Sequence, residues 1–412
     1  MDAFFEALGR TVLERWKREN FSLVKFPEIA RAALDESPPA ERIDLAALVR
    51  EFLLSDEQPP QTDSEFGEPE LVAYSHSRFY IQLLFWTDGT TAIHQHEFSG
   101  AFHVMHGSSI HAHYEFDNAQ PVTPYLRVGN LRMKSIELLE SGRTVPIASG
   151  PQAIHSLFHL DSPSVTVVVR TQHDPGTGPQ FNYLPPHVAL DPHFSDKLTM
   201  RRKQVLDMLE QVEDADYAEL VTEMVGDLDF ERGFSILYHC MAYLQQLGEW
   251  ERVLQMFEKK HGDLAAGVAA SLKEDVRRSV IKDLRSTIVE AEHRFFLALL
   301  MNAPTREDLL ALVAQRFPEE KPVATVMRWA GELTEVSDEG VTILDASFPQ
   351  TIEIDSDAQA ELFLSALRYF LTIDKKLPPA PAPPLAMRDL PAADVKALRA
   401  AFAESTLGLL MR

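Results

Sequence analysis

Histidines gather in one stretch of the chain. The sequence has 15 histidines, and 12 of them lie between His76 and His193. Histidine is the commonest metal ligand in proteins and a frequent proton-transfer group, so this stretch is where chemistry is expected. The alternative is a histidine-rich surface without a function.

The most specific pattern in that stretch is Ile93-His94-Gln95-His96. Residues i and i+2 of a β-strand face the same side, so His94 and His96 would present two imidazoles to one face. A third histidine, His155, follows in a later strand-like segment. Three such ligands form a facial set that leaves open positions for a substrate and dioxygen. We therefore predict that His94, His96 and His155 hold a metal ion.

These residues resemble the motifs of the cupin superfamily. The first cupin motif, G-x5-HxH-x3,4-E-x6-G, is similar to the segment from Gly89 to Gly107, with one residue fewer after the first glycine. His155 resembles the histidine of the second motif. The closest likeness is to the cysteine dioxygenase (thiol dioxygenase) type, which keeps a strand tryptophan, here Trp86, and a three-histidine iron site. Over residues 74–171, the likeness implies a β-barrel that binds Fe(II), with zinc, nickel or manganese as other possible metals.

The departures from the motif concern the substrate. The cupin glutamate would fall at residue 100, which is glycine here. Three neutral ligands leave a divalent metal its full charge, so we expect a small anionic, chelating substrate. In cysteine dioxygenases the residue equivalent to 100 is a cysteine cross-linked to a tyrosine. Their Tyr-x-Arg corresponds to Tyr74-Ser75-His76, which lacks the arginine. The likeness therefore implies a retained metal cage with altered substrate recognition.

Four further residues are candidates for substrate binding and catalysis. Arg170 lies near the end of a strand and could clamp a substrate carboxylate, with Arg78 as its rival. Tyr74 and His76 could donate hydrogen bonds to dioxygen or substrate. As surface residues of an edge strand, Tyr74 and His76 would have no such role.

The remaining histidines of the stretch are expected away from the metal. Strand alternation places His103 and His106 on the outer side. His111 and His113 form a second HxH pair, which either lines the barrel next to the metal ligands or belongs to a solvated face, and we favour the solvated face. His159 would brace the strand that carries His155. Tyr114 is interpreted as a core aromatic residue.

Three regions surround these residues. Residues 1–60 have helical periodicity, and residues 70–190 consist of short strand-like segments separated by turn residues, which is typical of an antiparallel sandwich or barrel. Residues 195–412 return to helical periodicity. The expected fold class is α+β: an antiparallel β-barrel of the cupin or jelly-roll kind, a short N-terminal helical segment and a large C-terminal all-α domain. Within the last region, 340–355 is predicted to form a hairpin and 378–384 a polyproline spacer.

Charge and cysteine content exclude several classes of function. The chain has 39 Lys and Arg against 62 Asp and Glu, a net charge of −23. That charge disfavours binding to nucleic acids and to anionic membranes. The single Cys240 excludes a disulfide framework and a cysteine zinc site, and it suits a reducing cytosol, so a cytoplasmic location is expected. The oligomeric state is left open.

Together these patterns predict a mononuclear non-haem iron dioxygenase, a cysteine dioxygenase-like oxidoreductase. Its substrates would be a small anionic chelating molecule and dioxygen. The alternative is a metal-binding cupin with a regulatory or protein-interaction role and no redox catalysis.

Overall fold

The computed structural model describes residues 3–63, 66–87, 91–336, 356–372, 387 and 390–411. Gly89, the hairpin predicted at 340–355 and the polyproline spacer predicted at 378–384 lie outside these residues.

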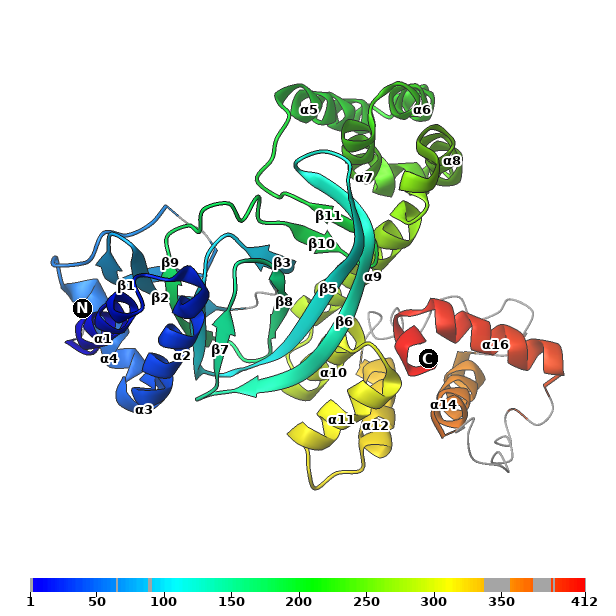
Figure 1. Cartoon of the computed structure of the whole chain (residues 1–412). Helices are drawn as coiled ribbons and strands as arrows, with labels where there is room; N and C mark the ends of the chain where they lie inside the picture. Colours follow the sequence, from blue (N-terminus) through cyan, green and yellow to red (C-terminus); the bar gives the residue numbers. More distant parts are fainter. Residues whose placement is uncertain are drawn as a thin grey trace.

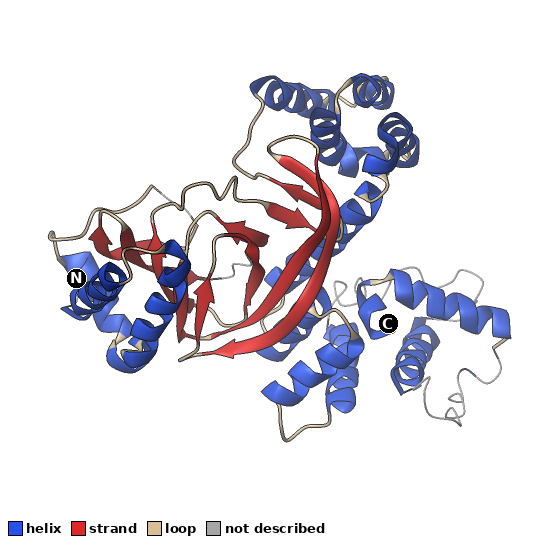
Figure 2. Cartoon of the chain, in the orientation of Figure 1, coloured by secondary structure: helices blue, strands red, loops and turns tan. Residues whose placement is uncertain are grey.

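The centre of the molecule is built from two groups of antiparallel strands (Figures 1 and 2). One is a sheet in the order β1-β2-β9-β4-β7, and the other is a closed arrangement in the order β10-β11-β6-β5-β8-β3. The strands are β1 (Glu70–His76), β2 (Phe79–Trp86), β3 (Ile93–His96), β4 (Gly100–His106), β5 (Ser108–Pro121), β6 (Leu126–Glu140), β7 (Thr144–Ile147), β8 (Gly150–His159), β9 (Ser164–Thr171), β10 (Asn182–Leu184) and β11 (Val188–Leu190).

Strand β2 shows why the first sheet is buried on both faces. All eight of its residues are buried. Alternate residues, such as Ile81 and Leu83, pack in a core with the N-terminal helices, whereas Leu84 and Trp86 belong to a separate core between this sheet and the closed arrangement. A strand covered on both sides is apolar throughout, which explains the continuous apolar run in this segment.

The N-terminal helices cover the outer face of that sheet. They are α1 (Ala3–Arg18), α2 (Phe26–Glu36), α3 (Pro39–Arg42) and α4 (Leu45–Leu54). In α1, Phe5, Leu8, Val12 and Trp16 recur at helical spacing and are buried. Trp16 lies against Phe26 of α2, at 4.3 Å between ring centroids. This apolar face fixes the helices on the sheet.

The C-terminal helices form two lobes joined by one long helix (Figure 1). The helices are α5 (Lys197–Gln211), α6 (Tyr217–Asp227), α7 (Phe230–Gln246), α8 (Trp250–His261), α9 (Val268–Thr287), α10 (Ala291–Asn302), α11 (Arg306–Arg316), α12 (Pro322–Val336), α14 (Ser356–Thr372) and α16 (Ala392–Glu404). Val268 and Leu272 of α9 belong to the core of α5 to α8. Ile281 and Leu284 of the same helix belong to the core of α10 to α16, which also includes Phe158 of β8.

The structure confirms the predicted fold class, an antiparallel barrel with a short N-terminal and a large C-terminal helical part. Strand β6 runs through Gly129, where a side chain would meet the Asp117 carbonyl oxygen at 2.8 Å and the Phe116 ring, so the close approach needs a glycine. Residues 276–301 are divided between α9 and α10. None of the helices in the described ranges is long and apolar enough to span a membrane.

Candidate metal centre and its cavity

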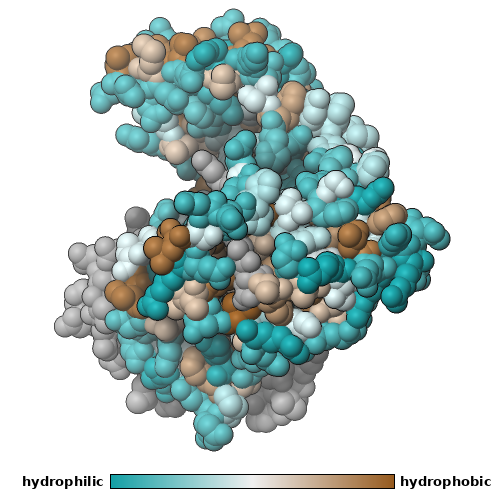
Figure 3. Space-filling model, turned by 90° about the vertical axis from the view of Figure 1, so that its left-hand side faces the viewer, coloured by the Kyte–Doolittle hydropathy of each residue, from teal (hydrophilic) through white to brown (hydrophobic). Residues whose placement is uncertain are grey.

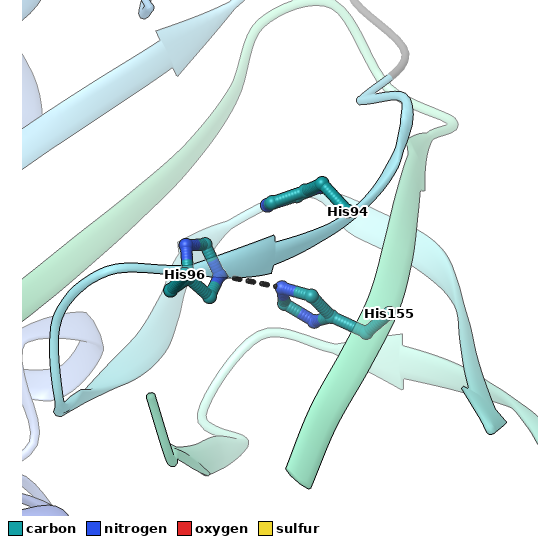
Figure 4. A group of neighbouring side chains, drawn as sticks. All are labelled: His94, His96 and His155. Carbon is teal, nitrogen blue, oxygen red and sulfur yellow. Dashed lines mark hydrogen bonds between the residues drawn. The ribbon is translucent and has the colours of Figure 1, made fainter. Parts of the chain in front are cut away.

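Three buried imidazoles meet inside the barrel. His94 and His96 come from β3 and His155 from β8, and their rings turn toward one another (Figure 4). One nitrogen from each ring lies within 4.8 Å of the others. The Nε2 atoms of His96 and His155 are 2.8 Å apart. The strand pairing explains this meeting, since His94 is the direct cross-strand partner of His155.

A backbone carbonyl next to His94 leaves one of its ring nitrogens free for a metal. His94 Nδ1–H donates to the carbonyl oxygen of Ala92 at 2.8 Å, so its Nε2 carries a lone pair. That Nε2 atom is buried and has no hydrogen-bond partner among the described residues. An orphaned buried nitrogen is costly unless something binds it, so the donor set fits a metal ion.

Two side chains, His111 and Glu137, lie in a row beside the third ligand. His155 Nδ1 and His111 Nε2 are 2.9 Å apart, and His111 Nδ1 lies 3.5 Å from a carboxylate oxygen of Glu137. If the Glu137 carboxylate holds the proton on His111 Nδ1, then His111 Nε2 accepts from His155 Nδ1–H. The Nε2 lone pair of His155 is then directed at the other two histidines.

Burial keeps the three imidazoles neutral. It lowers the pKa of His94 and lowers the pKa values of His96 and His155 well below the usual range. The neighbouring imidazoles lower the pKa values of His96 and His155 further. A neutral imidazole is the form that binds a metal, so the site is ready to bind at neutral pH without losing protons to solvent.

The structure corrects the expectation for the second HxH pair. His111 and His113 were expected on a solvated face, but His111 is fully buried and His113 is half-buried. His113 is the cross-strand partner of His155, so the pair shares the inner face with the metal-site histidines. His111, His113 and Glu137 also lie close enough to be considered as metal ligands. To accept a hydrogen bond from His155, His111 must carry its proton on Nδ1. A metal bound to His111 Nδ1 would displace that proton, so His111 cannot support His155 and bind a metal through Nδ1 at the same time.

The three histidines line a cavity of about 200 Å³. This volume exceeds the ~150 Å³ that holds one benzene-sized molecule, so it suits a small substrate. The lining is mainly apolar and aromatic, with a few polar groups, as is usual for small-molecule sites. Besides the histidines it includes Phe66, Gln82, Leu84, Trp86, Thr91, Phe98, Phe102, Ile147, Leu157, Thr166, Val168, Arg170, Gln180 and His193.

Of the two predicted carboxylate clamps, Arg170 reaches this cavity. Its guanidinium carbon lies 3.4 Å from the centroid of the Phe98 ring. Its Nε and Nη2 donate to the carbonyl oxygens of Thr171 and Gln172 at 3.3 and 3.4 Å. Burial lowers the pKa of Arg170, so this cation has lost more hydration than its neighbours replace. An anion in the cavity would restore that loss.

Gln82 is a cavity residue that sequence reasoning missed. Its side chain is buried, and its Oε1 atom has no hydrogen-bond partner in the described part of the chain. It points to the same side of β2 as Leu84 and Trp86, which also line the cavity. The sequence does contain a signal for this role. Gln82 is the one amide in an apolar strand, and its even spacing from Trp86 places both side chains on the same face. Gln82 can hydrogen-bond a polar group of a ligand.

Tyr74, His76 and Arg78 do not lie at the cavity, contrary to the prediction. Tyr74 packs against α1, where a side chain on Gly9 would lie 2.5 Å from its ring. His76 is half-buried beside Phe79. Arg78 is exposed and lies over the Phe21 ring at 4.3 Å. A bulge in β1 next to Val72 shifts the strand register, and Tyr74 and His76 then face the helices.

The other histidines were predicted to lie on the outer side of the strands or to brace β8. His106 is exposed, as expected for the outer side. His103 does face outward, but it is buried and bonded to Thr144 Oγ1 at 2.9 Å. His159 stacks on Trp86 with 4.6 Å between centroids and bonds Ser109 Oγ at 2.9 Å, so it ties β8 to β2 and β5.

Strands β4 and β9 approach closely at Gly100, the residue at which the resemblance to the cupin motif would place a glutamate. A side chain on Gly100 would lie 2.1 Å from the carbonyl oxygen of Val169. No carboxylate can therefore enter the site from this position, and the candidate ligand set consists of neutral imidazoles.

The comparison with known proteins finds similar solved structures but no similar sequence. No protein-family model and no curated protein sequence matches the chain. A Klebsiella pneumoniae protein with a double-stranded β-helix domain is 16% identical, with 32% of this chain and 90% of that chain covered, at a TM-score of 0.19. Hydroquinone 1,2-dioxygenase PnpCD is 15% identical over 27% of this chain and 68% of that chain, at a TM-score of 0.20. The DMSP lyase DddQ of Ruegeria pomeroyi is 14% identical over 45% and 98%, at a TM-score of 0.24.

Proposed function

We propose that this protein is a mononuclear non-haem iron dioxygenase that acts on a small anionic substrate. The observation that carries the proposal is the buried set of His94, His96 and His155 at a cavity that also contains Arg170. In this proposal the three Nε2 lone pairs would hold Fe(II), which would supply the redox chemistry by which dioxygen oxidises the substrate.

The chain's own residues would hold and orient the substrate. Arg170 donates to the substrate carboxylate, because its guanidinium has more N–H donors than the two carbonyl bonds use. Gln82 accepts a hydrogen bond from a hydroxyl, amine or thiol on the same molecule. The aromatic walls, including Trp86 and Phe98, exclude water and strengthen these polar contacts. The neutral histidine ligands and the Arg170 cation together favour an anionic substrate.

The proposed co-substrate is dioxygen, and the proposed location of the protein is the cytoplasm. Cys240 is buried, and burial raises the pKa of its thiol to about 11, so it would stay protonated and inert in a reducing compartment.

Metal content and oxygen consumption test the proposal. Protein purified without a histidine tag should contain iron near one atom per chain and should consume oxygen when small carboxylates bearing a hydroxyl, amine or thiol are added. A chain that holds zinc alone, or no metal, and consumes no oxygen would instead support the second candidate, a metal-binding protein with a regulatory or interaction role.

A further inference from the structure

One buried nitrogen beside the metal centre is not used by the three candidate ligands. His111 is 0% exposed, and its Nδ1 atom has no hydrogen-bond partner in the described part of the chain. A carboxylate oxygen of Glu137 lies 3.5 Å from this atom, beyond the range of about 2.7–3.2 Å that ordinary hydrogen bonds occupy. Most residues on the face drawn in Figure 3 are hydrophilic, whereas this polar atom lies in the interior, where an unpaired nitrogen is costly.

His113 and Glu137 bring two further donors to this nitrogen. His113 lies two residues from His111 on β5, so the two side chains share a face, and their ring centroids are 4.1 Å apart. Glu137 of β6 is the cross-strand partner of His111. One ligand atom from each of the three residues lies within 4.8 Å of the others. We call these three residues the outer cluster, and His94, His96 and His155 the inner cluster.

The outer cluster has the composition and the access that a metal site needs. Two imidazoles and a carboxylate are ligands for zinc and other divalent transition metals. An ion ~2.1 Å from His111 Nδ1 and from the facing oxygen of Glu137 would join them at roughly 115°, which is close to tetrahedral. The Glu137 side chain is 43% exposed, so an ion can enter from solvent. Its other oxygen lies 3.9 Å from Nη2 of the exposed Arg143, a weak pair that leaves the first oxygen available.

We propose that the outer cluster is a second metal site, which takes a divalent ion such as zinc, and that an ion there weakens metal binding at the inner cluster. The outer site stands on the geometry of its own three residues. The effect on the inner cluster rests on the proposed function, in which that cluster holds a metal.

One hydrogen bond couples the two clusters. His111 Nε2 and His155 Nδ1 are 2.9 Å apart, so one of them carries the proton and the other accepts it. A metal on His111 Nδ1 leaves the proton of the neutral ring on Nε2, which then donates to His155 Nδ1. A neutral His155 must in turn carry its own proton on Nε2, the atom that an inner metal would use. His96 Nε2 lies 2.8 Å from that atom and can accept its proton, so the proton has a partner in this state.

Zinc titration of a chain that lacks an inner ligand tests the outer site alone. His96→Ala leaves both the outer cluster and His155 in place. Isothermal titration calorimetry of the metal-free His96→Ala chain should show one zinc ion per chain, and adding His113→Phe should abolish that binding. His113 is changed because Glu137 also supports His155. Adding His106→Phe instead is the matched control, which should leave zinc binding unchanged because His106 is exposed and belongs to β4.

The unmodified chain tests the coupling. Once its inner site is filled, the zinc ion that depends on His113 should bind about 5- to 150-fold more weakly than in His96→Ala, which is the usual range for coupled sites. The His113→Phe chain should bind the inner ion alone. Circular dichroism shows whether each variant is folded, and His94→Ala supplies the same background if His96→Ala does not fold.

Three results would contradict the proposal in different ways. A His96→Ala chain that binds no zinc, or whose zinc binding survives His113→Phe, would overturn the outer site. Equal affinity of the His113-dependent zinc ion in the unmodified chain and in His96→Ala would overturn the coupling. If His113→Phe bound neither zinc nor Fe(II) while His96→Ala bound zinc, the proposed function and the coupling would both fail and the outer site would stand.

Discussion

At the scale of single residues, the metal ligands should matter for binding and little for folding. His96→Ala should abolish metal binding, because two imidazoles hold a divalent ion far more weakly than three. The thermal midpoint of the metal-free protein should stay close to that of the unmodified protein, since the barrel core is apolar. Metal analysis and calorimetry measure the two effects. His106→Ala, which changes an exposed histidine, should retain the metal. Unfolding of the His96→Ala chain would indicate a structural metal site.

Arg170→Gln should weaken substrate binding without loss of metal. A charge-assisted hydrogen bond contributes about 1.5–3 kcal/mol, so KM should rise by about 10- to 100-fold. Steady-state kinetics and metal analysis of the same sample separate the two effects. Arg78→Gln is the matched control, because Arg78 is exposed and lies away from the cavity. Equal changes in KM for both variants would exclude Arg170 as the clamp.

His159 should make the protein sensitive to acid. Burial, with the nearby Arg285 cation, lowers the pKa of His159 to about 3, against 6.5 for an unperturbed histidine. The folded state therefore binds fewer protons than the unfolded state between these pH values. Stability is present above pH 6.5 and falls as pH drops, by at most ~1.4 kcal/mol per pH unit for this group.

His159→Phe should reduce that pH dependence, because a phenyl ring can still stack on Trp86 but cannot be protonated. Urea unfolding between pH 4 and pH 7 measures the free energy of unfolding of both proteins. An unchanged slope would show that other groups control the acid response.

The sequence predicted the ligands better than their surroundings. The His94-Gln95-His96 spacing specifies two side chains on one strand face, and strand alternation is a local property that sequence reveals. Which face turns inward is decided by tertiary packing, so His111 and His113 were placed on the wrong side. Tyr74 was wrongly placed at the cavity for another reason: a bulge of one residue reverses the facing of every side chain after it.

At the scale of elements, the support that β5 and β6 give to His155 of β8 should control metal affinity. Glu137→Gln removes the charge that favours the proton on His111 Nδ1 and so weakens the orientation of His155. Loss of such a supporting group lowers metal affinity by about 10- to 100-fold. Competition with a chelator measures this affinity. Glu140→Gln is the control, since Glu140 lies on the same strand and faces Arg316 instead. Equal loss in both variants would argue against the chain from Glu137 to His155.

The contact between β4 and β9 should tolerate no side chain at residue 100. In Gly100→Ala, the new carbon meets the Val169 carbonyl, and forced overpacking of this kind costs about 1–3 kcal/mol. Urea unfolding measures the difference. Gly226→Ala should be neutral or stabilising, because its nearest neighbour is the flexible Met256 side chain at 3.7 Å. If Gly100→Ala were as stable as the parent protein, the absence of a carboxylate ligand would need another explanation.

At the scale of the whole molecule, the barrel and the C-terminal helices share a core. Ile110, Leu138 and Phe158 on the barrel pack in the same buried cluster as residues of α9 to α16. Arg285 of α9 also donates to the carbonyl oxygen of His159 at 2.9 Å. The boundaries at 1–60, 70–190 and 195–412 therefore describe changes in sequence pattern, and we propose that the parts they delimit fold together.

Phe158→Ala tests this coupling. Truncation of a buried phenylalanine costs about 3–5 kcal/mol. Native-state hydrogen exchange should show amides of β8 and α10 losing protection together. Faster exchange confined to β8 would show that the helical part is a separate folding unit.

The two faces of β8 give the molecule a built-in reporter. His155 lies on the inner face of the strand and Phe158 on the face packed against the helices. Any small molecule that fills the cavity binds the folded state alone and raises its melting temperature by mass action. Because the helices would melt together with the barrel, the melting temperature measured from helix ellipticity would rise when a ligand fills the cavity. A library of carboxylates could then be screened by helix melting alone, before any turnover assay exists.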